Sequence, residues 1–240
     1  MSDAPLNTEV AEYTERDERA PTLRYRVTFS SGGPLAFLSV LELGKVWERS
    51  LRRAGAPLRY SQGFNPRPKI QFALPLPTGC GGEAEWLDLW LDESWEPARL
   101  QAALEGCLPT GLRVRVVETV PEAEPGLAER VIAAEYTLWL HTISASDVQA
   151  AIATLLATER VLRPRRGKYR GQDYDLRPLI ESLELTPAPA PWVGLALRGT
   201  ALPRATGRPD EVVDALGLAA YLQRCTRQRI ILNNFSTEDE

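Results

Sequence analysis

Apolar and polar residues follow one another along this chain with the periods of short strands and helices. From Leu23 onward, the apolar Tyr25, Val27 and Phe29 alternate with polar neighbours, which is typical of a strand with one buried face. Apolar residues at helical spacing follow, and then the alternation returns. The pattern predicts the order strand, helix, strand, strand, helix, strand for the segments 23–30, 39–54, 69–74, 83–91, 97–107 and 112–120.

A similar order recurs in the second half of the chain, with one extra hairpin. We expect a strand, a helix, three strands, a helix and a final strand in the segments 131–140, 146–157, 159–165, 175–185, 192–198, 209–217 and 226–232. The two runs predict an α+β protein of two tandem ferredoxin-like halves, each an antiparallel sheet with two helices on one face.

Both ends of the chain are polar and acidic. The whole chain has a formal net charge of −4, but residues 1–23 carry −4 and the last three residues −3, which leaves the remainder at about +3. The acidic ends either aid solubility or shield a basic surface until a polyanion displaces them. The predicted parts are a mobile acidic N-terminal arm (1–22), the first half (23–120), a linker (121–130), the second half (131–235) and an acidic tail (236–240).

The first predicted helix has clear ends. Ser39 and Glu42, three residues apart, form the pattern of a capping box. Gly55 and Pro57 follow the last helical residues and end the helix. The expected buried stripe consists of Leu41, Trp47, Leu51 and Ala54.

The segment after this helix is a candidate recognition loop. It reads YSQGFNPRPKIQFALPLPTG from Tyr60 to Gly79 and contains four prolines. Each residue before a proline is held extended, and Gly63 permits a positive φ. A stiff projection lowers the entropy cost of binding; the alternative is a plain helix-to-strand connection with Phe64 in the core. The side chains that a projection would present are Tyr60, Gln62, Phe64, Asn65, Arg67 and Lys69.

Cations gather around this loop and again in the second half. Residues 45–69 hold one acid, Glu48, and seven cations: Lys45, Arg49, Arg52, Arg53, Arg59, Arg67 and Lys69. Residues 160–170 hold no acid and six cations: Arg160, Arg163, Arg165, Arg166, Lys168 and Arg170. Clustered Lys and Arg with an interleaved aromatic residue suit phosphates and unpaired bases. The alternatives are a solvated helix face, with a Glu48–Arg52 pair, and a charged hairpin tip.

The strand at 83–91 has two different faces. Leucines share one face, and Trp86, Asp88 and Trp90 share the other. If the leucines face the helices, the two tryptophans lie on the open face of the sheet, where RNA-recognition motifs stack bases. We favour the alternative, in which they are buried against the second half.

Composition excludes several kinds of chemistry. The three cysteines, Cys80, Cys107 and Cys225, lie far apart and have no spacing suited to zinc or an iron–sulfur cluster, and His141 is the only histidine. There is no phosphate-binding loop, nucleophile elbow or dinucleotide fingerprint. No segment is apolar enough to span a membrane or to serve as a signal peptide. We therefore expect a cytoplasmic protein without a cofactor or metal.

Several of these residues together resemble one family, the radical-SAM-associated proteins, a bacterial domain of unknown function. The similarity spans about residues 24–232 and rests chiefly on the first half. The matching residues are Phe37-Leu38-Ser39, Arg52-Arg53, Tyr60-Ser61, Gly63 to Pro66, Pro68-Lys69, Leu76-Pro77, Gly79, and Glu85 with Asp88, with weaker matches at 175–178 and 208–212. The resemblance implies a separately encoded radical SAM enzyme as partner and genes for RNA processing nearby.

Two positions depart from the pattern of that family. Val40 and Arg67 stand where relatives commonly carry histidine, and Glu42 replaces an aspartate. A member without these histidines cannot use imidazole chemistry there, but it can still bind phosphate.

The sequence thus predicts a non-catalytic accessory protein that binds RNA and works with a radical SAM enzyme. Two alternatives stay open: an RNA-cleaving or RNA-modifying enzyme of tandem ferredoxin-like type, and a protein–protein adaptor for the radical SAM enzyme. The predicted RNA- or partner-binding residues are Arg49, Arg52, Arg53, Tyr60, Gln62, Phe64, Asn65, Arg67, Lys69, Asp88, Arg163, Arg165, Arg166 and Lys168.

Overall fold

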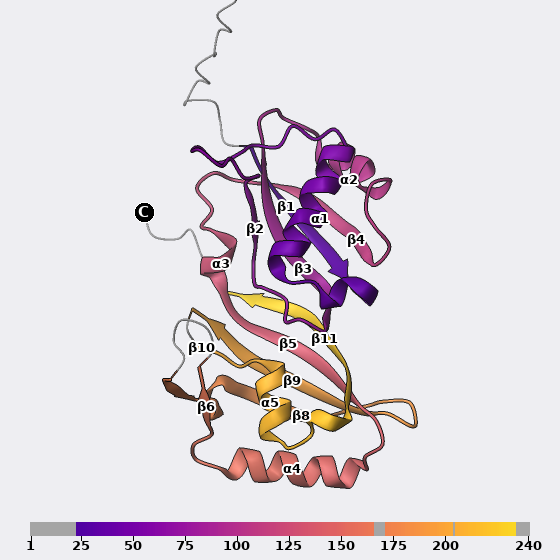
Figure 1. Cartoon of the computed structure of the whole chain (residues 1–240), viewed down its shortest axis with the longest axis vertical. Helices are drawn as coiled ribbons and strands as arrows, with labels where there is room; N and C mark the ends of the chain where they lie inside the picture. The colour runs from indigo at the N-terminus through magenta and orange to yellow at the C-terminus, as the bar shows by residue number, and fades with distance from the viewer. Residues whose placement is uncertain (1–22, 166–170, 204, 234–240) are drawn as a thin grey trace, which may run out of the picture.

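The structure, a computed structural model, describes residues 23–165, 171–203 and 205–233. The first half (Figure 1, upper part) contains β1 (Leu23–Ser31), the short 3-10 helix η1 (Gly33–Phe37), α1 (Val40–Arg53), β2 (Ile70–Phe72), β3 (Cys80–Leu91), α2 (Pro97–Glu105) and β4 (Leu112–Val120). A short α3 (Leu127–Arg130) precedes the second half. There follow β5 (Val131–Leu140), α4 (Ala145–Ala157), β6 (Leu162–Pro164), β7 (Asp173–Asp175), β8 (Ile180–Thr186), β9 (Val193–Leu202), β10 (Ala205–Thr206), α5 (Pro209–Ala215) and β11 (Leu222–Leu232).

One large, mostly antiparallel sheet runs through both halves. Its strand order is β10-β9-β5-β11-β3-β1-β4, with β2 also paired to β3 and β8 to β9. The expected extra hairpin is formed by β6 and β7. The separate sheets that we expected are joined by a short parallel ladder between β11 and β3, in which Cys225 faces Cys80 and Arg227 faces Gly82. The chain is thus a mixed α+β protein with few helices.

The structure has two hydrophobic cores, one within the first half and one mainly in the second half that also includes Ala73 and Cys80. The first core joins Trp47 and Leu51 of α1 to Val27 and Phe29 of β1, and the Phe29 and Trp47 rings meet edge to face at 5.0 Å. In the second core, α4 and α5 pack their apolar side chains on β5 and β9. Within the described ranges, no helix is both long and apolar enough to cross a membrane.

Helix α1 begins where its sequence predicted. The Ser39 side chain accepts a hydrogen bond from the backbone N–H of Glu42, and the Glu42 carboxylate accepts one from that of Ser39, so the capping box is confirmed. The predicted buried stripe is wrong at Leu41, which is largely exposed. The buried stripe instead begins at Leu43, which lies one turn before Trp47, whereas Leu41 is turned to the opposite side of the helix.

The three cysteines do not all lie apart. Cys80 and Cys225, on neighbouring strands with their Cα atoms 4.6 Å apart, form a disulfide, and Cys107 is free. Beside it, the buried Arg227 donates hydrogen bonds to the Glu85 carboxylate and to the Leu74 carbonyl. We call this junction of β3 and β11 the seam. No sequence spacing indicated the pairing, because 145 residues separate the two cysteines.

Candidate functional site

Three arginines of α1 line a surface hollow of about 420 Å³, which we call the arginine hollow. Arg49, Arg52 and Arg53 follow one another at intervals of one to four residues, so they share the helix face opposite the core. Val46 and Pro109 complete the lining. The sequence did not indicate Pro109, because it comes from the connection between α2 and β4.

The arginines keep donors for a ligand. Arg52 forms a 2.8 Å ion pair with Glu48, one turn earlier, and donates from Nε to the Tyr60 hydroxyl at 2.9 Å. That hydrogen bond raises the pKa of Arg52. Arg53 donates to the Cys107 carbonyl, and Arg49 is exposed and has no ion pair with any residue that the structure describes. Because a guanidinium has five N–H groups, each side chain can bind an anion as well.

The loop beside the hollow, residues 60–68, projects from the surface and is held by hydrogen bonds at its base; we call it the pinned loop. At its base Tyr60 and Pro68 form a bridge. The Ser61 N–H donates to the Arg67 carbonyl at 2.8 Å, and the Arg67 N–H donates to the Ser61 hydroxyl at 3.0 Å. Gly63, with a φ of 127°, provides the reversal at the tip. The expected projection is therefore present.

The side chains of this tip face solvent. Gln62, Asn65 and Arg67 are exposed, and Phe64 is fully exposed, at 106% of its reference area. The alternative in which Phe64 packs into the core is wrong. An aromatic ring that no described residue covers, on a backbone fixed by hydrogen bonds, is available for stacking or for an apolar contact.

Lys69 directly follows the Tyr60–Pro68 bridge at the base of the loop. Its Nζ lies 4.4 Å from the centre of the Trp90 ring, a cation–π arrangement. Partial burial lowers the pKa of Lys69, and the nearby charges of Arg59 and Arg24 lower it further. Arg24 and Arg59 are paired with Asp88 and Asp92, so an anion beside this cluster would bind chiefly to Lys69.

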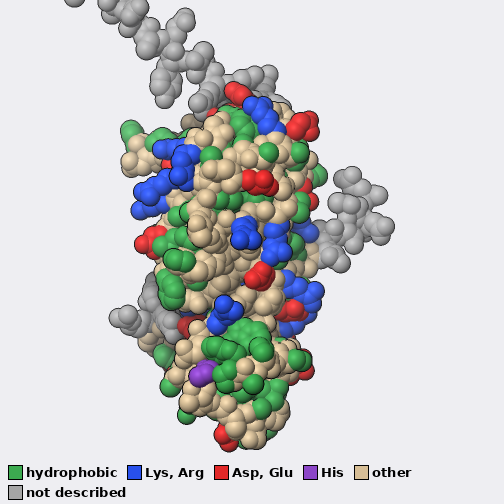
Figure 2. Space-filling model, turned by 90° about the vertical axis from the view of Figure 1, so that its right-hand side faces the viewer, with side chains coloured by type: hydrophobic (Ala, Val, Ile, Leu, Met, Phe, Trp, Pro, Cys, Tyr) green, Lys and Arg blue, Asp and Glu red, His purple; other side chains and the backbone are tan. Residues whose placement is uncertain are grey.

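The hollow and the loop form one continuous surface in the first half, because Arg52 lines the hollow and also contacts Tyr60 at the loop base. The Arg52 guanidinium lies 5.7 Å from the Tyr60 ring centre. On the face shown in Figure 2, Lys and Arg side chains gather on the upper part and middle of the molecule among some acids, whereas the lower end is mostly apolar or uncharged.

The second basic cluster is only partly described. Arg163 pairs with Glu211 at 3.0 Å and also with Asp214. The hydrogen bond to Asp214 raises the pKa of Arg163. The Arg165 guanidinium lies 5.2 Å from the Tyr174 ring centre. Arg166 and Lys168 lie outside the described residues. Both acids that hold Arg163 come from α5 of the same half, so this part of the cluster is largely neutralised.

Asp88 does not belong to the binding surface. Its carboxylate is completely buried and accepts hydrogen bonds from Nε of Arg24 at 2.8 Å and Nε of Arg26 at 2.9 Å. Trp86 is partly buried and packs against the second core, as we favoured. Trp90 is also buried, but its ring lies beside Arg24 and Lys69 of the first half. We therefore correct the assignment of Asp88: it neutralises two buried arginines on the face of the sheet away from the helices.

These arginines also hold the linker. Arg24 donates to the Glu124 carbonyl at 2.7 Å, and Arg26 donates to the Glu124 carboxylate at 2.6 Å. Burial alone would raise the pKa of Glu124, but the hydrogen bond from Arg26 and the charges of Arg26, Arg130 and Arg24 outweigh it, so the pKa lies below its ordinary value. The segment that we predicted as a linker (121–130) is therefore tied to β1 by the side chains of Arg24 and Arg26.

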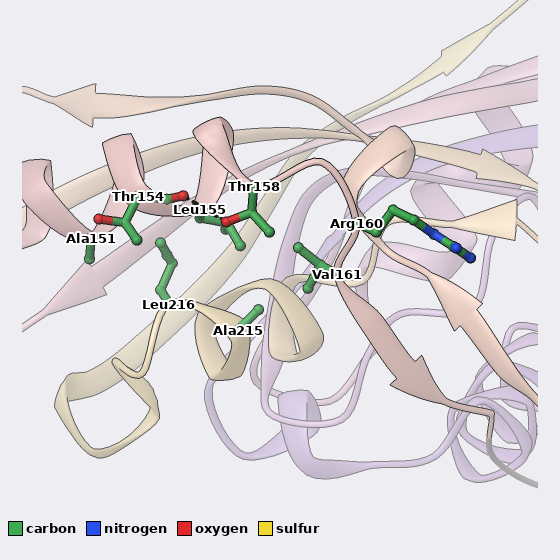
Figure 3. A pocket seen from close by; sticks show the side chains of 8 residues that line it. All are labelled: Ala151, Thr154, Leu155, Thr158, Arg160, Val161, Ala215 and Leu216. Carbon is green, nitrogen blue, oxygen red and sulfur yellow. Dashed lines mark hydrogen bonds between the residues drawn. The ribbon is translucent and has the colours of Figure 1, made fainter.

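A further hollow, of about 370 Å³, lies between α4 and α5 in the second half. Figure 3 shows a mixed lining of apolar side chains, such as Leu155 and Leu216, and two threonines, with Arg160 directed away from the other side chains. The Thr154 hydroxyl donates back to the Ala150 carbonyl of its own helix. No charged side chain among the labelled ones points into this hollow, whereas three arginines border the arginine hollow.

Comparison with known proteins gives one family and several distant folds. A family model described as "Uncharacterized protein conserved in bacteria (DUF2344)" matches residues 24–208. No curated protein matches the sequence. A chain of a Cbf5-Nop10-Gar1 complex is 10% identical with a TM-score of 0.49, over 86% of this chain and 48% of that one.

Two other solved structures give weaker matches. A chain from an H/ACA RNP bound to a substrate RNA is 10% identical, with a TM-score of 0.45, over 86% of this chain and 47% of that one. An unknown protein from Galdieria sulphuraria is 17% identical, with a TM-score of 0.26, over 82% and 91% of the two chains. The present chain thus spans about half the length of the first matched structures. Scores this low support no conclusion about function.

Proposed function

This chain belongs to the DUF2344 family of conserved bacterial proteins. From the geometry of the site, we propose that it is a non-catalytic accessory protein that binds RNA. The observation that carries the proposal is the continuous surface formed by the arginine hollow and the pinned loop. It combines three arginines with a fully exposed aromatic ring, Phe64, at the tip of a fixed backbone.

This combination matches the two chemical parts of single-stranded RNA. Arginine forks bind phosphate oxygens with two parallel hydrogen bonds, and an exposed aromatic ring stacks on an unpaired base. The Arg52–Tyr60 contact holds the two features beside each other. The hydrogen bonds at the loop base order the backbone before binding, so less entropy is lost when RNA binds.

We further propose that the protein works with a radical SAM enzyme. Support comes from the motif resemblance of the first half, which extends from the start of α1 through Asp88. In this arrangement the partner carries the iron–sulfur cluster and the reaction, and the present chain presents the RNA. The arginines of α1 and the exposed side chains of the loop supply the binding groups for that role.

The finer architecture is also a proposal. The strands of the first half follow the order β4-β1-β3-β2, and those of the second half follow β11-β5-β9-β8. Both orders correspond to that of a ferredoxin-like sheet, which supports two such halves within the continuous sheet. On this view residues 23–120 and 131–235 are the two units and 121–130 is the linker.

The test is a salt titration of binding to a pool of bacterial RNA, with the bound fraction sequenced. We expect micromolar or tighter binding that weakens steeply as salt rises, because each phosphate contact releases counterions. Enrichment of one class of RNA would identify the substrate. No binding at low salt would contradict the proposal.

The adaptor function is a second candidate, and the exposure of Phe64 favours it as well. An apolar ring at the tip of a rigid loop also suits a pocket on a partner protein. In that case the chain would bind the radical SAM enzyme without RNA, and Phe64→Ala would abolish that binding at both low and high salt.

A further inference from the structure

The disulfide stands at the point where the two halves of the sheet are joined. The ladder between β3 and β11 consists of three residue pairs: Cys225 with Cys80, Thr226 with Gly81, and Arg227 with Gly82. The first of these pairs also carries the disulfide, which links cysteines that are 145 residues apart in the sequence. A covalent bond therefore reinforces a short stretch of backbone pairing between the two halves.

A hollow opens directly over this bond. It has a volume of about 180 Å³, and both cysteines line it. Cys225 is 9% exposed, whereas Cys80 is 1% exposed, so the Cys225 side is the accessible one. Arg224 and Asp210 also line the hollow, and Asp210 accepts hydrogen bonds from Arg208. Both cysteines thus border an open hollow, and Cys225 is the less buried of the two.

A second set of contacts at the seam, made by Arg227, does not depend on the cysteines. Arg227 is fully buried, pairs with Glu85, and donates to the Leu74 carbonyl at 2.8 Å and the Pro75 carbonyl at 3.2 Å. These contacts and the ladder remain when the disulfide is open. We therefore expect loss of the bond to loosen the seam, where both cysteines belong to the second core, without unfolding either half.

We infer that Cys80 and Cys225 form a reversible thiol–disulfide site through which small thiols control how firmly the two halves are joined. In a thiol-rich compartment the bond opens, and under oxidising conditions it closes. The reactive ligand is a low-molecular-weight thiol.

The exchange is balanced with two thiol molecules. The thiolate of the first attacks Sγ of Cys225; a bond forms between these two sulfur atoms, the Cys80–Cys225 bond breaks, and Cys80 leaves as a thiolate that takes up a proton. The thiolate of the second molecule attacks the sulfur of the first, which releases the small disulfide and leaves Cys225 as a thiol. Two electrons pass from the two small thiols to the protein.

The first experiment measures the thiol state of the folded full chain. A Cys107→Ser background removes the free cysteine. The protein is equilibrated with mixtures of reduced and oxidised glutathione, treated with N-ethylmaleimide and weighed by mass spectrometry. Without denaturant, we expect the number of modified cysteines to rise from none to two in a single two-electron transition. We also expect the Cys80→Ser variant to take up one glutathione on Cys225 faster than the Cys225→Ser variant takes one up on Cys80. Modification only after denaturation, or two free thiols in the oxidised protein, would overturn the inference.

The second experiment measures the mechanical consequence by hydrogen exchange. In the reduced protein we expect the amides of β11 and of the start of β3 to exchange about tenfold faster or more, while those of α1 keep their rates, because local opening affects the segment that loses contacts. Cys80→Ser should show the same change and Cys107→Ser none. Equal exchange in the oxidised and reduced proteins would show that the bond does not control the seam.

Discussion

At the residue scale, two carboxylates of β3 serve the interior of the protein. Glu85 pairs with Arg227 at the seam, and Asp88 pairs with Arg24 and Arg26 beneath the linker. A buried charge is tolerated only with a partner and hydrogen bonds. Both acids belong to the sequence pattern on which the family resemblance rests, and their contacts give this part of the pattern a structural role.

Replacement of Asp88 should therefore destabilise the protein. Asp88→Asn removes the charge that pairs with the buried Arg24 and Arg26, of which Arg26 keeps its pair with Glu124. We expect a loss of about 3–5 kcal/mol in the free energy of unfolding, measured by urea denaturation. The matched control is Glu83→Gln, which breaks a pair with Arg115 whose two side chains are about half exposed and should cost about 0–1 kcal/mol. Equal losses in the two variants would contradict a structural role for Asp88.

The linker network should make stability depend on pH in the acid range. The pKa of Glu124 is below its ordinary value of 4.5, so the unfolded chain binds this proton more tightly than the folded protein. Its contribution is present above the unfolded pKa and is lost as the pH falls through the folded pKa. We expect Tm to fall below about pH 4.5 less steeply in Glu124→Gln than in the wild type. Identical profiles would exclude this contribution.

At the scale of elements, the loop between α1 and β2 separates folding from binding. Its backbone is fixed by the Tyr60–Pro68 bridge and the hydrogen bonds of Ser61 and Arg67, and its side chains contribute little to the core. Such a loop can change its side chains without loss of stability, as expected for recognition segments on a rigid scaffold.

Phe64 provides the test of this separation. Phe64→Ala removes no buried contact, so we expect an unchanged Tm and a loss of about 1–3 kcal/mol in RNA-binding free energy from lost base stacking, with recovery in Phe64→Trp. Phe37→Ala, at another largely exposed aromatic residue, should alter neither quantity. Normal RNA binding by Phe64→Ala would remove the ring from the interface.

Local patterns predicted these elements well. The Ser39–Glu42 cap, the leucine and tryptophan faces of β3 and the pinned loop all follow from residues close together in the sequence. The predicted burial of Leu41 was wrong because several apolar residues of α1 could have formed the buried stripe, and only packing against β1 selects Leu43. Pro109 was missed because it reaches the hollow from another element, without a local signal.

At the scale of the whole molecule, the two halves depend on contacts that link distant parts of the chain. The seam joins β3 to β11, and the linker crosses the sheet on Arg24 and Arg26 to reach β5. Sequence periodicity indicated the two sets of elements but not their continuous sheet, since strand pairing between residues 80 and 225 has no local pattern. The predicted surface, by contrast, needed only one helix and the loop after it.

The central claim is that the arginine hollow binds RNA phosphates, and the direct test compares two variants that lose positive charge. The hollow variant, Arg49→Ala/Arg52→Ala/Arg53→Ala, removes the three guanidinium groups that line the hollow. The control variant, Arg113→Ala/Arg115→Ala, removes two exposed arginines from the edge strand β4. RNA affinity is measured against salt concentration, with Tm as the control for folding. We predict that the first variant loses about 0.7 per removed phosphate contact from the slope of log affinity against log salt, and that the second keeps the wild-type slope. Equal slopes in the wild type and the hollow variant would contradict the account.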